Sequence, residues 1–221
     1  MEYCPFCHIR LREYAFLPSL PIVSSIVRTN NILCKSENFN VFPDIAPIVP
    51  YHILISPIEH YNSIESFTES ILDEFNSIKK SVSDFIAHET TLPTLFFEHG
   101  GSACDISLQS TPCIDHAHLH ALPCEKQNTE NILHELSRIA RRTETVELGA
   151  SYLSIQYNGQ TYFWETPVNK RQILRKTIAN VLGSYNRDVW QSCLYGIELL
   201  KTEEWLNLFE NKDLVLTSVN K

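Results

Sequence analysis

The stretch CIDHAHLHALP, residues 113–123, places three histidines at alternate positions with apolar residues between them. Because the side chains of a β-strand point alternately to its two faces, His116, His118 and His120 are expected to line one face of a strand. Three buried imidazoles that face the same way without partners would lose much favourable hydration. This face therefore predicts an occupant, either a metal ion or a phosphoryl group. The alternative is an idle cluster on the surface.

The overall composition favours a folded protein with its own core. The chain has 221 residues, 43% of them hydrophobic and 20% charged, which suffices for one domain or one domain with an appendage. No apolar run approaches the ~18 residues of a membrane span, and the first residues lack the apolar segment of a secretion signal. A formal net charge of -8 disfavours long nucleic acid as a partner. We expect a soluble cytoplasmic protein that does not bind membranes.

The cysteines indicate reduced thiols. There are seven, an odd number, and without a secretion signal a disulfide framework is not expected. Cys4 and Cys7 form a CxxC pair. In a reducing compartment such a pair is a zinc half-site, a redox pair or an accident of a cysteine-rich chain.

Hydrophobic spacing predicts a mixed α+β order. Apolar or β-branched runs between turn residues predict strands, and apolar residues three or four apart predict amphipathic helices. Asn158-Gly159, the strongest short hairpin signal, lies between two alternating runs. The expected strands are 31–35, 51–56, 94–100 and the two arms of a hairpin in 151–165, and the expected helices are 63–89, 128–142 and most of the chain from 171 onward. No repeat or Gly/Ser linker marks a domain boundary.

Three motifs together resemble the histidine-triad (HIT) superfamily of nucleotide hydrolases and transferases. HAHLHAL followed by Pro123 resembles the triad pattern His-x-His-x-His with two apolar residues after it. FPDIAPIVPYHILISPIEH, residues 42–60, resembles the family segment Asp-x-x-Pro…Gly-His-x-Leu-Val-Ile-Pro-x-x-His, with Tyr51 in place of the usual Gly. CPFC, residues 4–7, resembles the CIFC opening of zinc-bearing members.

The resemblance implies an α+β, HIT-like fold: an antiparallel sheet flanked by helices, with the triad on a central strand. Residues 1–125 would form the catalytic core with the CxxC zinc site. Residues 126–221 would form an extension packed on that core, a helix, a hairpin and further helices, or the two would be one continuous domain. Relatives often dimerise, so a homodimer is an expectation.

The resemblance assigns catalytic roles to three histidines. His118, the middle residue of the triad, would attack the α-phosphorus of a nucleotide, and water would then cleave the nucleotidyl-imidazole. His120 would contact the phosphate and serve the leaving group. His52 would orient the phosphate. The alternative for His52 is a core histidine on a buried strand.

The resemblance also places the substrate. Asp44 would accept hydrogen bonds from the ribose hydroxyls, with Phe42 and Ile45 against the base. The alternative is that Asp44 is simply a turn residue. Many relatives carry a Gln-Ser pair before the triad that donates hydrogen bonds to the phosphate, but here Pro112 and Cys113 stand there. Proline has no N–H and cysteine is a weak donor. Cys113 is kept as a candidate contact beside the backbone N–H groups and hydroxyls of the preceding loop.

In zinc-bearing relatives the CxxC is completed by two histidines, and the matching residues here are His60 and His116. Cys4, Cys7, His60 and His116 would make a closed, structural Zn²⁺ site, because no coordination position stays open for water. His8 is a rival fourth ligand. The first histidine of the triad would then hold the site together.

Several functions remain open at this stage. Because the third triad residue is His120, the resemblance favours hydrolysis of a dinucleoside polyphosphate, a nucleoside phosphoramidate or a nucleotidylated small molecule. The alternatives are a nucleotidyltransferase or phosphorylase, a nucleotide-binding module with weak catalysis, and a structural zinc domain. Nucleic-acid binding would need a local basic strip, for which the candidates are Arg141, Arg142, Arg171, Arg175 and Lys176.

Overall fold

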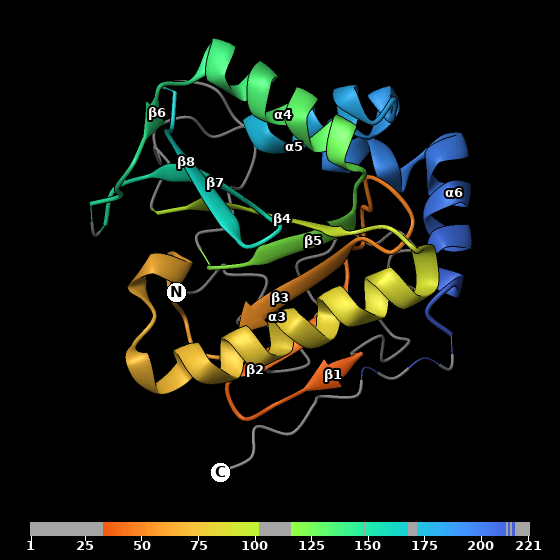
Figure 1. Cartoon of the computed structure of the whole chain (residues 1–221). Helices are drawn as coiled ribbons and strands as arrows, with labels where there is room; N and C mark the ends of the chain where they lie inside the picture. Colours follow the sequence, from red (N-terminus) through yellow and green to blue (C-terminus); the bar gives the residue numbers. More distant parts are fainter. Residues whose placement is uncertain are drawn as a thin grey trace.

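The described part of the chain folds into one β-sheet with α-helices packed against it. The computed structural model describes residues 33–101, 116–147, 149–167, 172–210, 212 and 214 (Figure 1). Its strands are β1 (Cys34–Lys35), β2 (Phe39–Pro43), β3 (Ile53–Pro57), β4 (Thr94–Gly100), β5 (Leu119–Pro123), β6 (Arg142–Thr143), β7 (Tyr152–Tyr157) and β8 (Gln160–Glu165). Its helices are α3 (Glu69–Thr90), α4 (Lys126–Ile139), α5 (Ile173–Val181) and α6 (Gly196–Asn207), with 3-10 turns η1 (Ile64–Ser66), η2 (Tyr185–Arg187) and η3 (Trp190–Leu194).

The eight strands form one antiparallel sheet in the order β1-β2-β3-β5-β4-β7-β8-β6. Helix α3 covers one face, and α4 and α5 cover the other, as Figure 1 shows. The predicted α+β fold, an antiparallel sheet flanked by helices, is therefore confirmed, and β5 lies near the middle of the sheet. Strands β6, β7 and β8 extend the sheet that the earlier strands begin, while the division at residue 125 stays a prediction.

Two apolar cores lie on the two faces. On the α3 side, Ile53, Leu119 and Ala121 belong to a cluster with the inward face of α3. On the other side, Phe97 and Leu122 belong to a cluster with α4 and α5. Since His120 alternates with Leu119 and Ala121, its side chain lies on the α4 and α5 face.

The hairpin is confirmed at the residues that predicted it. β7 and β8 pair in register from Tyr157↔Gln160 outward. The turn residues Asn158 and Gly159 have φ angles of 48° and 77°. Positive φ at both positions is what a two-residue turn needs to match the strand twist, and Asn-Gly adopts it readily.

The long helix begins later than expected. The prediction of one helix over 63–89 is wrong at its start, because the 3-10 turn η1 comes first and Phe67 is extended before α3 begins at Glu69. The Phe67 ring packs 5.6 Å from Phe39 and 5.2 Å from Phe75, measured between ring centroids. Burying this ring between the sheet and the helix favours the break in the helix.

The strand predicted for the three histidines is also too long. β5 begins at Leu119, so His120 lies within it, whereas His116 and His118 precede it. The backbone before Leu119 pairs with a loop instead of a strand: Ala117 N–H donates to Tyr61 O at 2.6 Å. At this deviation the His116 ring contacts His60, with ring centroids 5.0 Å apart.

None of the helices in the ranges given above combines the length and apolar character needed to cross a bilayer.

Candidate functional site

His52 and His120 form a hydrogen-bonded pair at the centre of the sheet. His120 lies on β5 opposite Leu54 of β3, and His52 immediately precedes β3. His52 Nε2 lies 2.9 Å from His120 Nδ1. Ile48 N–H donates to His52 Nδ1 at 3.1 Å, so this nitrogen carries no proton. His52 therefore donates through Nε2, and His120 keeps its own proton on Nε2.

Packing fixes the His120 ring in one plane. It stacks on Phe97 with ring centroids 4.4 Å apart and an interplanar angle of 2°. Phe97 reaches this position because it is the direct partner of His120 across β4 and β5. The aromatic stack and the hydrogen bond from His52 together leave the ring little rotational freedom.

His118 is oriented by the backbone. Its Nδ1–H donates to the carbonyl oxygen of His116 at 2.7 Å, which makes Nε2 the unprotonated nitrogen. The ring lies 4.9 Å from the His120 ring, measured between centroids. Burial, followed by the proximity of His120, lowers the pKa of His118 to about 3, so the ring is neutral at pH 7. A neutral imidazole with a defined tautomer is the form that attacks phosphorus.

Asp44 lies beside this pair of histidines and is only 5% exposed. Its Oδ1 accepts from Ala46 N–H at 2.8 Å, and its Oδ2 lies 3.4 Å from His52 Nδ1 and 3.6 Å from His120 Nδ1. Burial alone would raise the pKa of Asp44, but His52, His120 and Arg175 outweigh it and hold the pKa far below its usual range. Asp44 is thus an anion enclosed by nitrogen atoms.

Asp44, His52 and His120 also form a group whose ligand-type atoms lie within 4.8 Å of one another, as a metal site would require. Two of these atoms are already joined in the hydrogen bond between the histidines. The Arg175 guanidinium, 3.7 Å from Asp44 Oδ2, already supplies a positive charge. These contacts favour a site without a metal at this point in the fold.

The first triad histidine contacts the other histidine of the predicted zinc set. The rings of His60 and His116 lie 5.0 Å apart at 84°. His116 Nε2–H donates to Pro57 O at 2.8 Å, and burial lowers the pKa of His116 to about 4. Cys4 and Cys7 lie outside the described residues, so the four-ligand set stays a prediction.

The predicted base contacts flank Asp44. Phe42 and Ile45 are both half-buried. Phe42 pairs with Leu54, which in turn pairs with His120, so Phe42 lies on the same face of the sheet as the histidines. Cys113 lies outside the described residues, and so does the loop before it.

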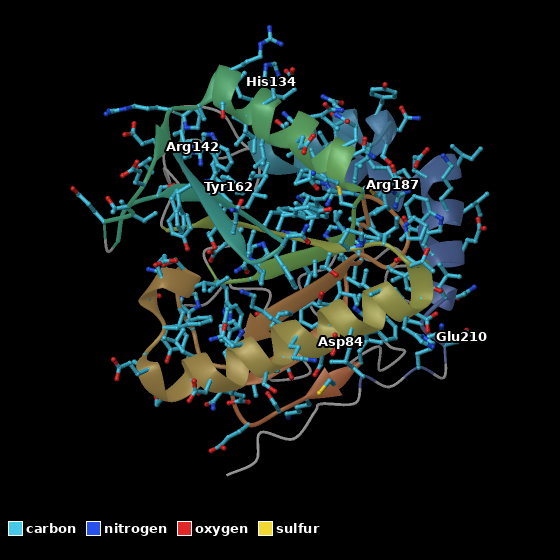
Figure 2. The ribbon with its side chains drawn as sticks, in the orientation of Figure 1. Asp84, His134, Arg142, Tyr162, Arg187 and Glu210 are labelled. Carbon is cyan, nitrogen blue, oxygen red and sulfur yellow. The ribbon has the colours of Figure 1, made fainter. Side chains whose placement is uncertain are left out.

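Sequence reasoning missed Arg175 as a site residue. The sequence offers Arg175 only as a candidate for a local basic strip, and it cannot serve there, because it is 8% exposed and its guanidinium lies beside Asp44. Arg142 is exposed and lies over the Tyr162 ring, 4.9 Å from its centroid, on the edge strand β6 (Figure 2). No local sequence signal separates a buried arginine from a solvated one on an amphipathic helix.

Glu98 occupies the opposite face of the sheet from the histidines, one residue after Phe97 on β4. Its Oε1 accepts from Ile64 N–H at 2.8 Å, and its Oε2 is hydrogen-bonded to the Tyr152 hydroxyl. Burial raises the pKa of Glu98 to about 8, against the lowering effect of these two hydrogen bonds. Glu98 is therefore a neutral acid in the folded protein at pH 7.

An antiparallel sheet with a histidine triad at its centre defines a protein of the histidine-triad type. The sequence model of the family described as "Scavenger mRNA decapping enzyme C-term binding" matches residues 21–134, just over half of the chain. The chain belongs to this HIT-like family. Members of the superfamily act on nucleotides as hydrolases or transferases. Membership supports a nucleotide-related activity of this general kind for the chain.

Solved structures of histidine-triad proteins are similar over part of the chain. A HIT family protein from Bacillus anthracis is 21% identical, with 62% of this chain and 95% of that chain covered and a TM-score of 0.41. A HIT family hydrolase from Clostridium thermocellum is 26% identical, with 57% and 94% covered and a TM-score of 0.36. A Zn-bound histidine triad family protein from Mycobacterium smegmatis is 20% identical, with 57% and 77% covered and a TM-score of 0.38. No curated protein matches the chain.

Proposed function

We propose that this protein is a nucleotide hydrolase that forms a nucleotidyl intermediate on His118. The observation that carries the proposal is the 2.7 Å hydrogen bond from His118 Nδ1–H to the His116 carbonyl. It presents Nε2 as the nucleophilic nitrogen, beside a second histidine whose ring is locked in place. A histidine with only a structural role would need neither a fixed tautomer nor a second, immobilised histidine beside it.

In the first proposed step, His118 Nε2 attacks the α-phosphorus. The N–P bond forms, and the P–O bond to the leaving group breaks with its electron pair on oxygen. The nucleotidyl-imidazole carries a positive charge, which the His116 carbonyl stabilises through the retained Nδ1–H bond. His120 Nε2–H donates a hydrogen bond to the phosphoryl or leaving oxygen as negative charge develops there.

In the second step, water attacks phosphorus from the side that the leaving group vacated. The new P–O bond forms, the N–P bond breaks, and the proton of the water is released as His118 returns to its neutral form. The net change is nucleotidyl ester plus water to nucleoside monophosphate, leaving group and a proton. Transfer to inorganic phosphate instead of water is the alternative that shares the first step.

The proposed substrates are small nucleotides, namely dinucleoside polyphosphates, nucleoside phosphoramidates and nucleotidylated small molecules. The family description names a scavenger mRNA decapping enzyme, and this adds the mRNA cap as a candidate substrate class. Phe42, Ile45 and Asp44 are proposed as the base and ribose contacts, and Cys113 as a contact of the phosphate. In this proposal residues 1–125 form the catalytic core and residues 126–221 an extension that packs on it.

Intact mass measurement of protein quenched with denaturant at alkaline pH tests the proposal, because acid would hydrolyse the P–N bond of the adduct. After incubation with the substrate classes above, one nucleotidyl group is expected on the protein, and peptide fragmentation should place it on His118. The base of the trapped nucleotide would also identify the substrate. Binding of nucleotide without an adduct and without turnover would contradict the proposal and favour a binding module.

We also propose a structural Zn²⁺ held by Cys4, Cys7, His60 and His116. The donor set fits zinc, since two thiolates and two imidazoles complete a tetrahedron. The bond from His116 Nε2–H to the Pro57 carbonyl supports it, because such a second contact fixes the tautomer of a metal-binding histidine and makes Nδ1 the nitrogen that a metal would take. When bound, zinc would tie the first residues of the chain to the triad segment.

Metal analysis of the purified protein is expected to give about one zinc per chain. Cys4→Ser should lose most of it and should unfold at a lower temperature, because metal affinity contributes to folding. Cys34→Ser is the matched control, since Cys34 is a half-buried free thiol on β1, and it should retain zinc. A protein that is fully folded without metal would overturn the assignment.

A further inference from the structure

Arg175 of α5 reaches the histidine site from a distant part of the sequence. Its Nε–H donates to Arg187 O at 3.0 Å, and one of its terminal nitrogens, Nη2, donates to Ala46 O and lies 3.5 Å from Cys193 Sγ. The other, Nη1, lies 3.7 Å from Asp44 Oδ2. Three of these contacts fix the guanidinium, and the fourth aims it at the carboxylate of the site.

The segment that Arg175 holds also orients His52. Asp44 and Ala46 belong to the same short turn as Ile48, whose N–H fixes the tautomer of His52. Arg187 anchors this turn a second time through its Nε–H, which donates to Pro47 O. The turn that supplies both the carboxylate and the orienting N–H is therefore clamped by two buried arginines (Figure 2 labels Arg187).

Arg187 is itself held by the C-terminal helix. Its Nη1 donates to Glu198 Oε2 at 2.9 Å, its Nη2 donates to Thr202 Oγ1 at 2.6 Å, and its guanidinium lies 4.4 Å from the centroid of the Trp205 ring. The clamp is thus a continuous chain of contacts from α6 to Asp44.

Charge balance explains why an arginine suits this position. Burial has the largest effect on His52 and His120 and lowers the pKa of both. Asp44 raises both pKa values and so favours a protonated histidine beside it, whereas Arg175 lowers both and Arg187 also lowers that of His52. With Arg175 present, the carboxylate has its counter-charge, and the two histidines can share the single hydrogen bond of a neutral pair.

We propose that Arg175 is a positioning residue of the histidine site: it acts through Asp44 to keep His52 and His120 in their catalytic orientation. The C-terminal segment would then be part of the catalytic apparatus. The kinetic part of this inference rests on the proposed nucleotidyl transfer to His118, whereas the contact itself does not.

Kinetics of Arg175→Gln, Arg175→Lys and Lys176→Gln test the proposal. Lys176 is the exposed neighbour on the same helix, so its variant is a matched control and should keep wild-type kinetics. Arg175→Gln should lower kcat by up to about 100-fold with a smaller change in KM, since sub-ångström misplacement of a catalytic group has effects of this size. Arg175→Lys should recover part of kcat, because it restores the charge but not the fork of donors.

A double-mutant cycle distinguishes positioning from packing. If Arg175 acts through Asp44, then Arg175→Gln should change kcat by less than about threefold in an Asp44→Asn background. An equal loss in both backgrounds, or Arg175→Gln kinetics equal to those of Lys176→Gln, would overturn the proposal. Thermal unfolding of each variant shows whether it is folded. If Arg175→Gln does not fold, Arg175→Lys takes its place in the cycle.

¹⁵N NMR of the histidine rings at pH 7 reports the protonation state of His52 and His120 without any need for substrate turnover. The charged or titratable groups that face the pair are Asp44, Arg175, Arg187 and His118. Arg175→Gln should shift His52 or His120 toward the imidazolium form, and the double variant should shift them back. If the wild type makes no adduct, the proposed function fails, and these spectra alone decide the role of Arg175: unchanged spectra would refute it.

Discussion

Replacing His118 with alanine is expected to lower kcat by at least about 1,000-fold and to abolish the nucleotidyl adduct, because the nucleophile is removed. The fold should survive, since the His118 ring donates a hydrogen bond to a backbone carbonyl and the sheet pairing starts at the next residue. Initial rates over a range of substrate concentrations, combined with intact mass, measure both effects.

His134→Ala is the matched control for this variant. His134 is on α4, its side chain is 73% exposed, and Figure 2 shows it at the upper edge of the molecule. It should retain full activity. If His118→Ala kept more than a tenth of the wild-type rate, water would have to attack the substrate directly, and the covalent mechanism would be wrong.

Glu98→Gln is expected to remove a contribution to stability that is lost between about pH 5 and pH 8. In the folded protein the pKa of Glu98 is raised to about 8, above its ordinary value of 4.5. The folded state therefore holds a proton on Glu98 that the unfolded state has released, so the contribution of Glu98 falls as pH rises through this window. The buried histidines have lowered pKa values and act in the opposite sense below about pH 6.5, so the quantity to compare is the difference between wild type and variant. The slope from one such group is at most about 1.4 kcal/mol per pH unit.

Glutamine suits the test because it keeps the shape and the hydrogen-bonding capacity of the neutral acid. Its carbonyl can accept from Ile64 N–H, and its amide can donate to the Tyr152 hydroxyl. Urea unfolding at pH 5, 6, 7 and 8 gives the free energy of unfolding for each variant. Glu204→Gln, an exposed change on α6, should leave the slope as in the wild type. If the difference in unfolding free energy between wild type and Glu98→Gln stayed constant from pH 5 to pH 8, Glu98 would not hold the extra proton.

The parts of the fold that the sequence predicted well are those specified by neighbouring residues. Asn158-Gly159 fixes its hairpin through backbone angles that only a few residues adopt easily. The alternation around His120 likewise predicts that its side chain and Leu122 share one face of the sheet. In both cases the determining information lies within a few residues.

Tyr51 shows how a departure from a family pattern becomes intelligible in the structure. It stands where the family has glycine, and its φ of 61° is one that glycine adopts without strain. The strain of about 1 kcal/mol or more is offset by side-chain contacts that glycine lacks. The Tyr51 hydroxyl donates to Glu89 at 3.1 Å, and its ring packs 6.2 Å from Phe85 and 5.5 Å from Phe209.

The buried face of helix α6 could not be predicted from hydrophobic periodicity, because its pattern is inverted. Glu198 and Thr202 face inward, whereas Ile197 and Leu200 are 68% and 63% exposed. The inward polar residues are explained by Arg187, which they bind. That partner lies in a different segment, so a reading based on neighbours along one helix assigns the wrong face.

The contact between Arg175 and Ala46 has a consequence for the order of events during synthesis. The two residues are 129 positions apart, so Ala46 leaves the ribosome long before Arg175 is made. At roughly 5–20 residues per second, the delay is on the order of 6 to 26 seconds. Throughout this interval the turn that carries Asp44 lacks its arginine partner. The nascent chain can pair its first strands early, but it completes its histidine site only after α5 has been synthesised.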